Sequence, residues 1–350
     1  MPRGGTPTAR QDAAALLRVA FVTIHVLIAC WAWLLSLLPA SAQSLQPVSV
    51  IVFPGGFNWP IWVAQEYGYF AKSGVAVTLT NTPNSVFQLT NLIDGKFDIA
   101  VTAIDNVIAY TEGQGEVPVA TTADLVAFMG GDNGLLSLAS VPEVKNYADL
   151  KGRTLSVDAM TTGYAFVLFD MLRRHGLNSG DYRVEKAGGV LARWQALQAH
   201  QHDGTLLLTP FDLLAKAAGF NVLEYAIDLY GHYQGLVSAT RRAYARDHPT
   251  ALIGYIRGYL AGLAWLYDPR NSEAAAALLR KNVPHMSASL AQQSYAALVS
   301  PKGFAPRAQI DPAGVGTVLE LRSRYGEPRR VLADPAKYYE PQYYQAARTN

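Results

Sequence analysis

Short apolar segments alternate with amphipathic segments along the first third of the chain. Residues 48–53 (VSVIVF) are mostly apolar and β-branched, which predicts a buried strand. A loop with two glycines follows, then a helix from Pro60 to about residue 70 and a second strand over 75–80. The pattern continues with a helix over 85–93, a strand over 97–102 and a helix to about residue 112. Strands that alternate with helices in this way predict a parallel sheet covered by helices.

The same alternation restarts in the middle of the chain. Three strands, each followed by a helix, are predicted over residues 153–158, 182–186 and 205–209. A further strand is expected over 117–121, and the glycine-rich stretch 124–138 then suits a crossing between two lobes. Residues 229–239 are the expected return crossing. The pattern therefore predicts two lobes of one α/β architecture.

The last third of the chain is predicted to be helical. Helical periodicity is found over residues 248–267, 272–281, 287–298 and 312–325. Asp268 and Pro269 end the first of these helices, because the residue before a proline disfavours helical geometry. These helices form a C-terminal extension of the two lobes.

The first 42 residues have the composition of a targeting segment. Three arginines accompany an apolar run over residues 19–38, and Ala40-Ser41-Ala42 is a small-residue cleavage site. This order predicts a secretory signal peptide over residues 1–42 and a periplasmic protein. The apolar run is also long enough for an uncleaved membrane anchor, and this alternative stays open.

Composition narrows the class of partner. Of the 350 residues, 50% are hydrophobic and 16% are charged, as in an ordinary globular protein. Without residues 1–42 the chain has 26 basic and 26 acidic residues and no cysteine. A neutral balance with no basic run argues against a nucleic-acid partner. A chain without disulfides must be stable through its core, which suits a large periplasmic fold that we expect to be monomeric.

Catalytic and metal-binding motifs are missing from the sequence. No Gly-x-Ser-x-Gly, P-loop or paired-cysteine pattern is present. His200 and His202 lie beside Asp203 at a predicted helix end, where histidines are more often solvated than metal-bound. The sequence therefore predicts no catalytic residue, no metal and no cofactor.

Four stretches carry a resemblance to a known family. They are AQEYGYFAKSGVAV over residues 64–77, LIDGKFDIA over 92–100, DLKGRTLSV over 149–157 and the apolar helical stretch over 247–266. They resemble the solute-binding proteins of ABC importers, in the branch that binds sulfonates, taurine, nitrate and thiamine precursors. This branch is related to the yeast thiamine-pyrimidine synthase. The resemblance implies an α/β, two-lobed periplasmic binding protein fold of type II, in which each lobe is a mixed sheet flanked by helices.

The resemblance also implies how the chain is divided. Residues 46–128 and 236–350 are expected to form the first lobe, and residues 135–230 the second. The hinge between the lobes is expected near residues 124–138 and 226–236. A ligand would be closed between the two lobes.

Several loops of the first lobe supply candidate ligand contacts, because ligands of such sheets bind where strands lead into helices. The candidates are Phe57, Asn58 and Trp59, then Asn84 and Ser85, then Asp105 and Asn106. Asp105 and Asn106 suit helix capping equally well, so both roles stay open. If Asp105 faces the cleft, it disfavours an anion and suits an amine or hydroxyl donor.

The second lobe supplies the remaining candidates. Thr161, Thr162, Gly163 and Tyr164 match the loop that holds the anionic or polar head in sulfonate-binding relatives. Two hydroxyls and free N–H groups at a helix start suit a carboxylate or sulfonate. Phe211 and Asp212 follow the next strand, and Tyr233 lies in the return crossing. Trp194 has the spacing of a core residue.

The resemblance implies a function in transport. The expected protein captures a small organic solute, a sulfonate, carboxylate, pyrimidine or amine, and delivers it to an ABC permease in the inner membrane. One alternative is an enzyme like the thiamine-pyrimidine synthase, although the chain lacks the cysteine-rich motif of that enzyme. The other alternative is a binding protein that feeds a membrane sensor.

Overall fold

The structure is a computed structural model that describes residue 1 and residues 44–120, 123–284 and 286–349. The signal peptide predicted over residues 1–42 lies outside the described residues, apart from Met1. The chain divides into a unit over residues 1–44 and a compact unit over residues 45–350, and the second unit is described here. Within the described ranges, no helix is both long and apolar enough to cross a membrane.

The first lobe is built on a five-stranded sheet with the order β2-β1-β3-β10-β4. Its strands are β1 (Gln46–Val52), β2 (Val75–Asn81), β3 (Ile99–Ala103), β4 (Leu125–Gly130) and β10 (Leu236–Arg241). Strands β1, β2 and β3 run parallel, whereas β10 is antiparallel to both β3 and β4. Val50, Ile51 and Val52 are fully buried, because helices cover both faces of this strand.

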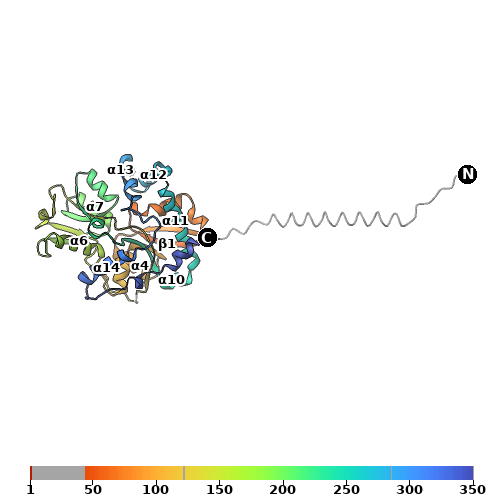
Figure 1. Cartoon of the computed structure of the whole chain (residues 1–350), viewed down its shortest axis with the longest axis horizontal. Helices are drawn as coiled ribbons and strands as arrows, with labels where there is room; N and C mark the ends of the chain where they lie inside the picture. The colour runs from red at the N-terminus through yellow and green to blue at the C-terminus, as the bar shows by residue number, and fades with distance from the viewer. Residues whose placement is uncertain (2–43, 121–122, 285, 350) are drawn as a thin grey trace. The chain divides into compact units, whose positions relative to one another are not determined.

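The second lobe repeats this plan with the strand order β7-β6-β8-β5-β9. Its strands are β5 (Leu136–Ser140), β6 (Thr154–Val157), β7 (Arg183–Lys186), β8 (Gly204–Leu208) and β9 (Asn221–Tyr225). Strand β6 is parallel to β7 and β8, and β5 is antiparallel to β8 and β9. Figure 1 shows the helices of this lobe, α6 and α7, on the opposite side from β1 and α11 of the first lobe. The predicted class, two mixed sheets flanked by helices, is confirmed.

Sixteen described helical elements of more than three residues and two three-residue turns surround the sheets in chain order. In the first half these are η1 (Gly56–Asn58), α2 (Trp59–Glu66), α3 (Tyr69–Lys72), α4 (Ser85–Ile93), α5 (Ile104–Thr111), η2 (Tyr147–Leu150), α6 (Gly163–Arg174) and α7 (Val190–Gln198). In the second half they are α8 (Phe211–Ala217), α9 (Ala226–Tyr230), α10 (Arg242–Asp247), α11 (Pro249–Tyr267), η3 (Pro269–Asn271), α12 (Ser272–Asn282), α13 (Ala288–Leu298), α14 (Pro312–Tyr325), η4 (Pro335–Tyr338) and α15 (Gln342–Arg348).

Two local predictions were wrong. The helix expected from Pro60 to about residue 70 is two helices, α2 and α3, because Gly68 takes a left-handed conformation with φ 68° between them. Residues 117–120 form no strand, and residue 121 lies outside the described residues. Pro118 has no N–H to donate to a ladder, so this segment is a poor partner for a sheet.

Both crossings between the lobes meet at Asp132. The outgoing crossing joins β4 to β5, and the return crossing joins α9 to β10. The buried Asp132 carboxylate accepts the backbone N–H of Gly134 at 2.6 Å and that of Leu236 at 3.2 Å. Burial raises the pKa of Asp132 to about 6, and these hydrogen bonds offset only part of that shift. One carboxylate therefore ties the two crossings together.

The C-terminal helices contact both lobes. Helix α14 packs on α5 of the first lobe and on α6 of the second, and it lies between α4 and α6 in the view of Figure 1. The tail beyond α14 stays with the first lobe. Tyr339 pairs with Ala127 along the edge of β4, and α15 packs on α11.

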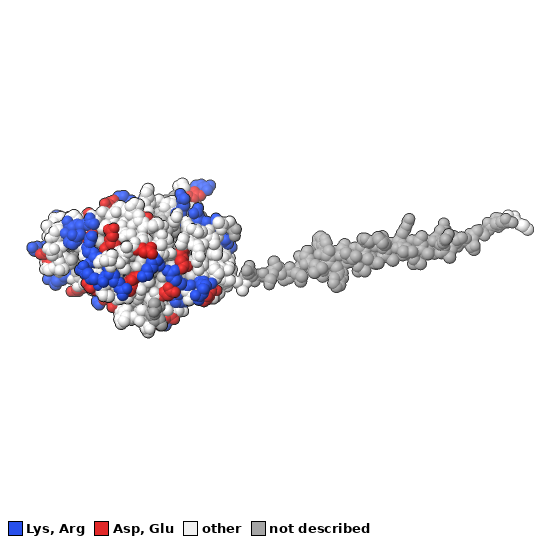
Figure 2. Space-filling model, turned by 60° about the horizontal axis from the view of Figure 1, so that its bottom comes forward, with Lys and Arg blue, Asp and Glu red and all other residues white. Residues whose placement is uncertain are grey.

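Surface charges of both signs are mixed. On the face shown in Figure 2, Lys and Arg side chains lie beside Asp and Glu side chains. Arg173, Arg174 and Arg324 all contact the buried carboxylate of Asp170. Burial raises the pKa of Asp170, but the hydrogen bonds from Arg174, Arg173 and two tyrosines outweigh it and hold that pKa below its usual value. The near-neutral balance of the sequence is thus distributed as local ion pairs.

We expect Asp132 to make the stability of the protein pH-dependent. Because the pKa of Asp132 is raised in the folded state, the folded protein gains stability as the pH falls through about 6 toward the pKa that this group has in the unfolded chain. Relative to Asp132→Asn, the free energy of unfolding of the natural protein should rise by roughly 1–2 kcal/mol from pH 7 to pH 5. Urea denaturation at both pH values measures this difference, and a difference that does not change with pH would contradict the prediction.

A second prediction concerns the contact between α2 and α11. A Cβ atom on Gly262 would lie 2.2 Å from the backbone oxygen of Pro60. Gly262→Ala should therefore lower the free energy of unfolding by roughly 1–3 kcal/mol. Gly316→Ala in α14 is the matched control, because a Cβ there meets no atom within 4 Å. The control should be neutral or stabilising, and equal thermal stability of the two variants would refute the close packing.

Candidate functional site

A small cavity of about 40 Å³ lies between the lobes, with room for a few water molecules. Both sheets contribute to it through loops and helix starts that follow their strands. This is the edge at which α/β sheets bind ligands. The residues that line it are Phe53, Phe57, Ala103, Asn106, Asp158, Thr162, Gly163, Tyr164, Val190, Arg193, Leu208 and Leu236.

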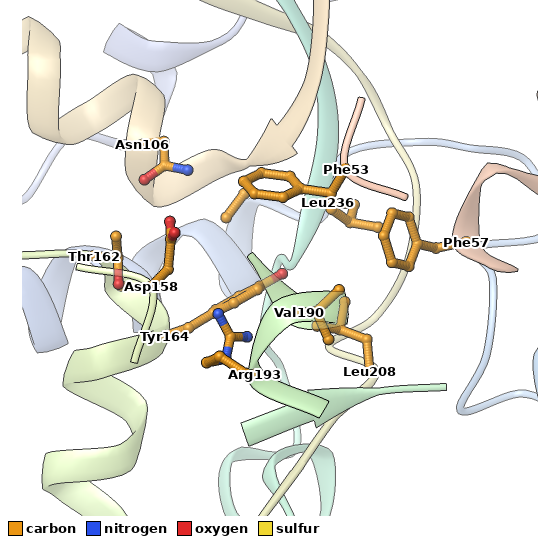
Figure 3. Close-up of a pocket in the computed structure, with 12 residues that line it drawn as sticks. Phe53, Phe57, Asn106, Asp158, Thr162, Tyr164, Val190, Arg193, Leu208 and Leu236 are labelled. Atoms are coloured by element: carbon orange, nitrogen blue, oxygen red, sulfur yellow. The ribbon is translucent and has the colours of Figure 1, made fainter. Parts of the chain in front are cut away.

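Asp158 is the acidic residue of the cavity. It follows β6 directly, and its Oδ2 accepts the backbone N–H of Ser85, at the start of α4 in the other lobe, at 3.0 Å. Its Oδ1 is shielded from solvent and has no hydrogen-bond partner among the described residues. In Figure 3 the carboxylate points toward the amide of Asn106. The cavity thus contains a buried acceptor oxygen without a donor.

Tyr164 contributes a second unpaired group. It lies in the first turn of α6, and its hydroxyl is buried without a hydrogen-bond partner in the described part of the chain. Burial raises the pKa of Tyr164 well above its usual value, and the nearby charge of Asp132 adds to this shift. The phenol therefore keeps its proton and is able to donate a hydrogen bond.

Arg193 is the cation of the cavity, and it is fully buried. Its Nε and Nη2 donate to the carbonyl of Leu206 at 3.3 and 3.1 Å, and its Nη1 donates to the carbonyl of Gly188 at 2.9 Å. Burial lowers the pKa of Arg193, while the charge of Asp158 favours the charged form. The guanidinium is thus held by main-chain carbonyls below Tyr164 in Figure 3.

Asp105 is paired with a residue far along the chain. Arg322 of α14 donates from Nε and Nη2 to its two carboxylate oxygens, both at 2.6 Å, and both side chains are 0% exposed. Arg322 also donates to the carbonyl of Thr161 in the second lobe at 2.6 Å. The sequence left two roles open for Asp105, a helix cap and a ligand contact that would disfavour an anion. In the structure the charge of Asp105 is instead neutralised within the protein by Arg322.

The hydroxyls of Thr161 and Thr162 are also occupied. The Thr161 hydroxyl and N–H donate to Glu116 at 3.0 and 3.2 Å, and Lys186 donates to the other oxygen of Glu116. The Thr162 hydroxyl donates to the carbonyl of Ala159 and caps α6 by accepting the N–H of Ala165. The predicted hydroxyl pair for an anionic head is therefore used by the chain itself.

Several predicted residues do line the cavity. Phe57 and Asn106 reach it from the first lobe, and Thr162, Gly163 and Tyr164 reach it from the second. At Gly163 a Cβ atom would lie 2.4 Å from the side chain of Asp105, so the lobes meet closely there. Contact of these residues with a ligand stays a prediction.

Other predicted residues lie away from this cavity. Trp59 is fully buried against Tyr295 of α13, so its ring supports the first lobe instead of facing the cleft. Asn58 donates to the carbonyl of Phe53, and Asn84 caps α4 by accepting the N–H of Phe87. These three side chains shape the loops around the cavity.

Phe211, Asp212 and Tyr233 have other surroundings. Phe211 lines a second hollow of about 550 Å³, together with Trp194, Val283 and Pro284. Asp212 accepts a hydrogen bond from Tyr225, and Tyr233 is buried beside Tyr230. None of these three residues lines the cavity between the lobes.

Sequence reasoning missed seven lining residues. Asp158 and Phe53 were assigned to strands, but each directly follows a strand and so begins a loop. That position at the carboxyl end of a parallel strand was the available signal. Arg193 was missed because it lies on α7, where the spacing of Leu191, Trp194 and Leu197 indicated a helix that packs in the core. The others are Ala103, Val190, Leu208 and Leu236.

Two lobes with mixed five-stranded sheets and a cavity between their strand ends define the periplasmic binding protein fold. Residues 58–272, well over half of the chain, match the family described as NMT1/THI5 like. The chain belongs to the NMT1/THI5-like family. The family resemblance seen in the sequence is thus confirmed.

Solved structures show the same fold at low sequence identity. A protein from Bordetella bronchiseptica RB50 is 18% identical with a TM-score of 0.73, over 86% of this chain and 96% of that chain. The alkanesulfonate-binding protein from Xanthomonas axonopodis pv. citri, bound to MOPS, is 17% identical with a TM-score of 0.67, over 85% and 99%. The periplasmic nitrate-binding protein from Synechocystis PCC 6803 is 11% identical with a TM-score of 0.71, over 88% and 89%. No curated protein matches the sequence.

The buried pair of Asp105 and Arg322 predicts a large mutational effect. Arg322→Met leaves the Asp105 carboxylate buried without its cation, so the free energy of unfolding should fall by about 3–5 kcal/mol. Adding Asp105→Leu removes the unpaired charge and should recover part of this loss. Arg329→Met, which breaks an exposed pair with Glu327, is the control and should change little. Chemical denaturation measures all four proteins, and a small effect of Arg322→Met would contradict the pairing.

Proposed function

We propose that the protein is a periplasmic receptor that captures a small organic solute between its lobes and delivers it to an ABC permease. One observation carries this proposal. Loops from the strand ends of both sheets enclose a cavity in which two polar atoms, Asp158 Oδ1 and Tyr164 OH, have no hydrogen-bond partner among the described residues. Such groups are costly to bury unless a ligand pairs with them. The alkanesulfonate-binding and nitrate-binding proteins that share the fold of this chain support the same function.

The proposed division follows the two sheets. Residues 46–128 and 236–350 would form the first lobe and residues 135–230 the second, with the hinge near residues 124–138 and 226–236. Support comes from the strand orders, because β4 and β10 belong to one sheet and β5 and β9 to the other. Asp132, which joins both crossings, would lie at the pivot.

The described arrangement corresponds to closed lobes. A cavity of about 40 Å³ is smaller than most organic solutes, so entry requires the lobes to separate or the walls to move. A solute that contacts both lobes would then favour closure by shifting an equilibrium between open and closed states. Phe53 and Phe57 would contact its body, while Asp158, Asn106 and Tyr164 would pair with its polar groups.

We propose binding without catalysis. Two of the named relatives are binding proteins, and the cysteine-rich motif of the synthase is missing from this sequence. An enzyme that acts on a pyrimidine is the alternative, and turnover by the purified protein would decide for it. A receptor that feeds a membrane sensor would use the same cavity, and neighbouring genes would separate it from an importer.

The test of the proposed function is a search for the bound solute. A native mass spectrum of freshly purified protein should show a co-purified small molecule, and adding that molecule to stripped protein should raise its melting temperature by several degrees. Tyr164→Phe should reduce the shift, whereas Tyr67→Phe, on an exposed ring of the first lobe, should not. If a library of sulfonates, carboxylates, pyrimidines and amines gives no stabilised complex and no molecule co-purifies, the proposal fails.

A further inference from the structure

The polar groups around the cavity restrict the chemical class of ligand that it can hold. We propose, on the basis of the proposed function, that the site binds a small nitrogen compound that donates N–H hydrogen bonds to Asp158. An ammonium, an amidinium or a protonated heterocycle has this chemistry, and a bare sulfonate or nitrate does not. The site therefore differs in ligand class from the sulfonate- and nitrate-binding proteins that share its fold.

One carboxylate oxygen of Asp158 lacks a hydrogen-bond donor in the part of the chain that the structure describes. Its Oδ2 is satisfied by the N–H of Ser85, but its buried Oδ1 receives no hydrogen bond from the described residues. The oxygens of an ionised carboxylate accept hydrogen bonds but cannot donate them. The missing partner is therefore a donor. A cationic N–H group makes the strongest such bond, because the bond is then charge-assisted.

The other two carboxylates near the start of α6 are already paired. Asp105 is held by Arg322, and Glu116 is held by Thr161 and Lys186. The hydrogen bonds to Glu116 outweigh its burial and hold its pKa below the usual value, so it stays ionised. Each of these acids has its own donors. Asp158 is the one of the three that faces the cavity with an unpaired oxygen.

The start of α6, where an anion would be expected to bind, has its hydroxyl donors already in use. The hydroxyl and N–H of Thr161 are occupied by Glu116, and the hydroxyl of Thr162 by Ala159. The Asp105 side chain lies directly against Gly163 in the first turn of α6. The chain's own acceptors thus occupy the hydroxyls of Thr161 and Thr162, so a sulfonate would find no free hydroxyl donor at this helix start.

Arg193 does not reverse this preference. All three of its nitrogen atoms donate to the carbonyls of Leu206 and Gly188, and the described residues show no ion pair between it and Asp158. Its charge is close enough to interact with Asp158. The cavity is therefore near neutral, and a ligand with a single delocalised positive charge suits it better than one with a higher charge.

The remaining walls specify the rest of the ligand. Phe53, Phe57, Val190, Leu208 and Leu236 present apolar surface to the cavity, and the ring of Phe53 extends toward the polar end in Figure 3. An aromatic face beside a bound cation adds attraction. The expected ligand is compact, with an N–H group at one end and an apolar or aromatic body at the other.

Isosteric ligands of opposite charge test this inference. Amidines and carboxylates have nearly the same shape, so benzamidine is compared with benzoate, and acetamidine with acetate, by calorimetry at pH 7. At least one amidine should bind at least about tenfold more tightly than its carboxylate. If neither amidine binds, or if benzoate or benzenesulfonate binds as tightly as benzamidine, the inference is overturned.

Variants of the polar groups complete the test. Asp158→Asn should weaken amidine binding at least about tenfold, while Asp94→Asn, at an exposed acid of the first lobe, should leave it unchanged. Melting temperatures without ligand check that both proteins are folded. If Asp158→Asn is not folded, Tyr164→Phe takes its place and should weaken amidine binding severalfold, because the hydroxyl oxygen of Tyr164 is also able to accept an N–H hydrogen bond. Unchanged binding in the folded variant would reject the assignment.

The outcome for the ligand class is separable from that for the function. A co-purified anion that stabilises the protein would overturn this inference and leave the receptor function intact. The absence of any ligand, in the mass spectrum and in the ligand library, would remove the receptor function as well.

Discussion

The buried contact of Arg322 with Asp105 and Thr161 is the interaction that joins the two lobes beside the cavity. Burying two charges is expensive, and the cost is offset here by two short hydrogen bonds between fully buried groups and a third to a carbonyl. Because the acid belongs to the first lobe and the carbonyl to the second, one guanidinium connects both. It also lies over the ring of Phe166 in α6, with 4.8 Å between its Cζ and the ring centre. Lobe separation would have to break the bond to Thr161 while Asp105 keeps its partner.

Much of the fold follows from local pattern. The helix predicted over residues 312–325 has the same bounds as α14, and the glycine-rich crossing falls between two strands that belong to different sheets. Such features depend on periodicity and turn chemistry, which a short window of sequence contains. The partner of Asp105 could not be found in this way, because Arg322 lies 217 residues away. The same limit applies to Trp59, whose position beside Tyr295 is decided by the docking of α13.

The candidate site was predictable in outline only. The rule that ligands bind at the carboxyl ends of strands located Phe57, Asn106 and the start of α6, all of which line the cavity. A shift of one residue in the predicted strand ends concealed Phe53 and Asp158, because a residue inside a strand is expected to pack in the core. The sequence also shows which residues are able to form hydrogen bonds, but not which of those bonds are already made. The hydroxyls of Thr161 and Thr162 were candidates for this reason, and internal acceptors occupy both.

The position of β10 has a consequence for the order in which the chain can fold. This strand lies between β3 and β4, so residues 236–241 complete a sheet whose other strands end at residue 130. During synthesis from the N-terminus, all strands of the second lobe are made before β10, the last strand of the first lobe's sheet. The long-range pairing must wait for more than a hundred further residues, which makes it an intrinsically slow step. Until then β3 and β4 each lack their common neighbour, and their exposed edges are open to pairing with other chains.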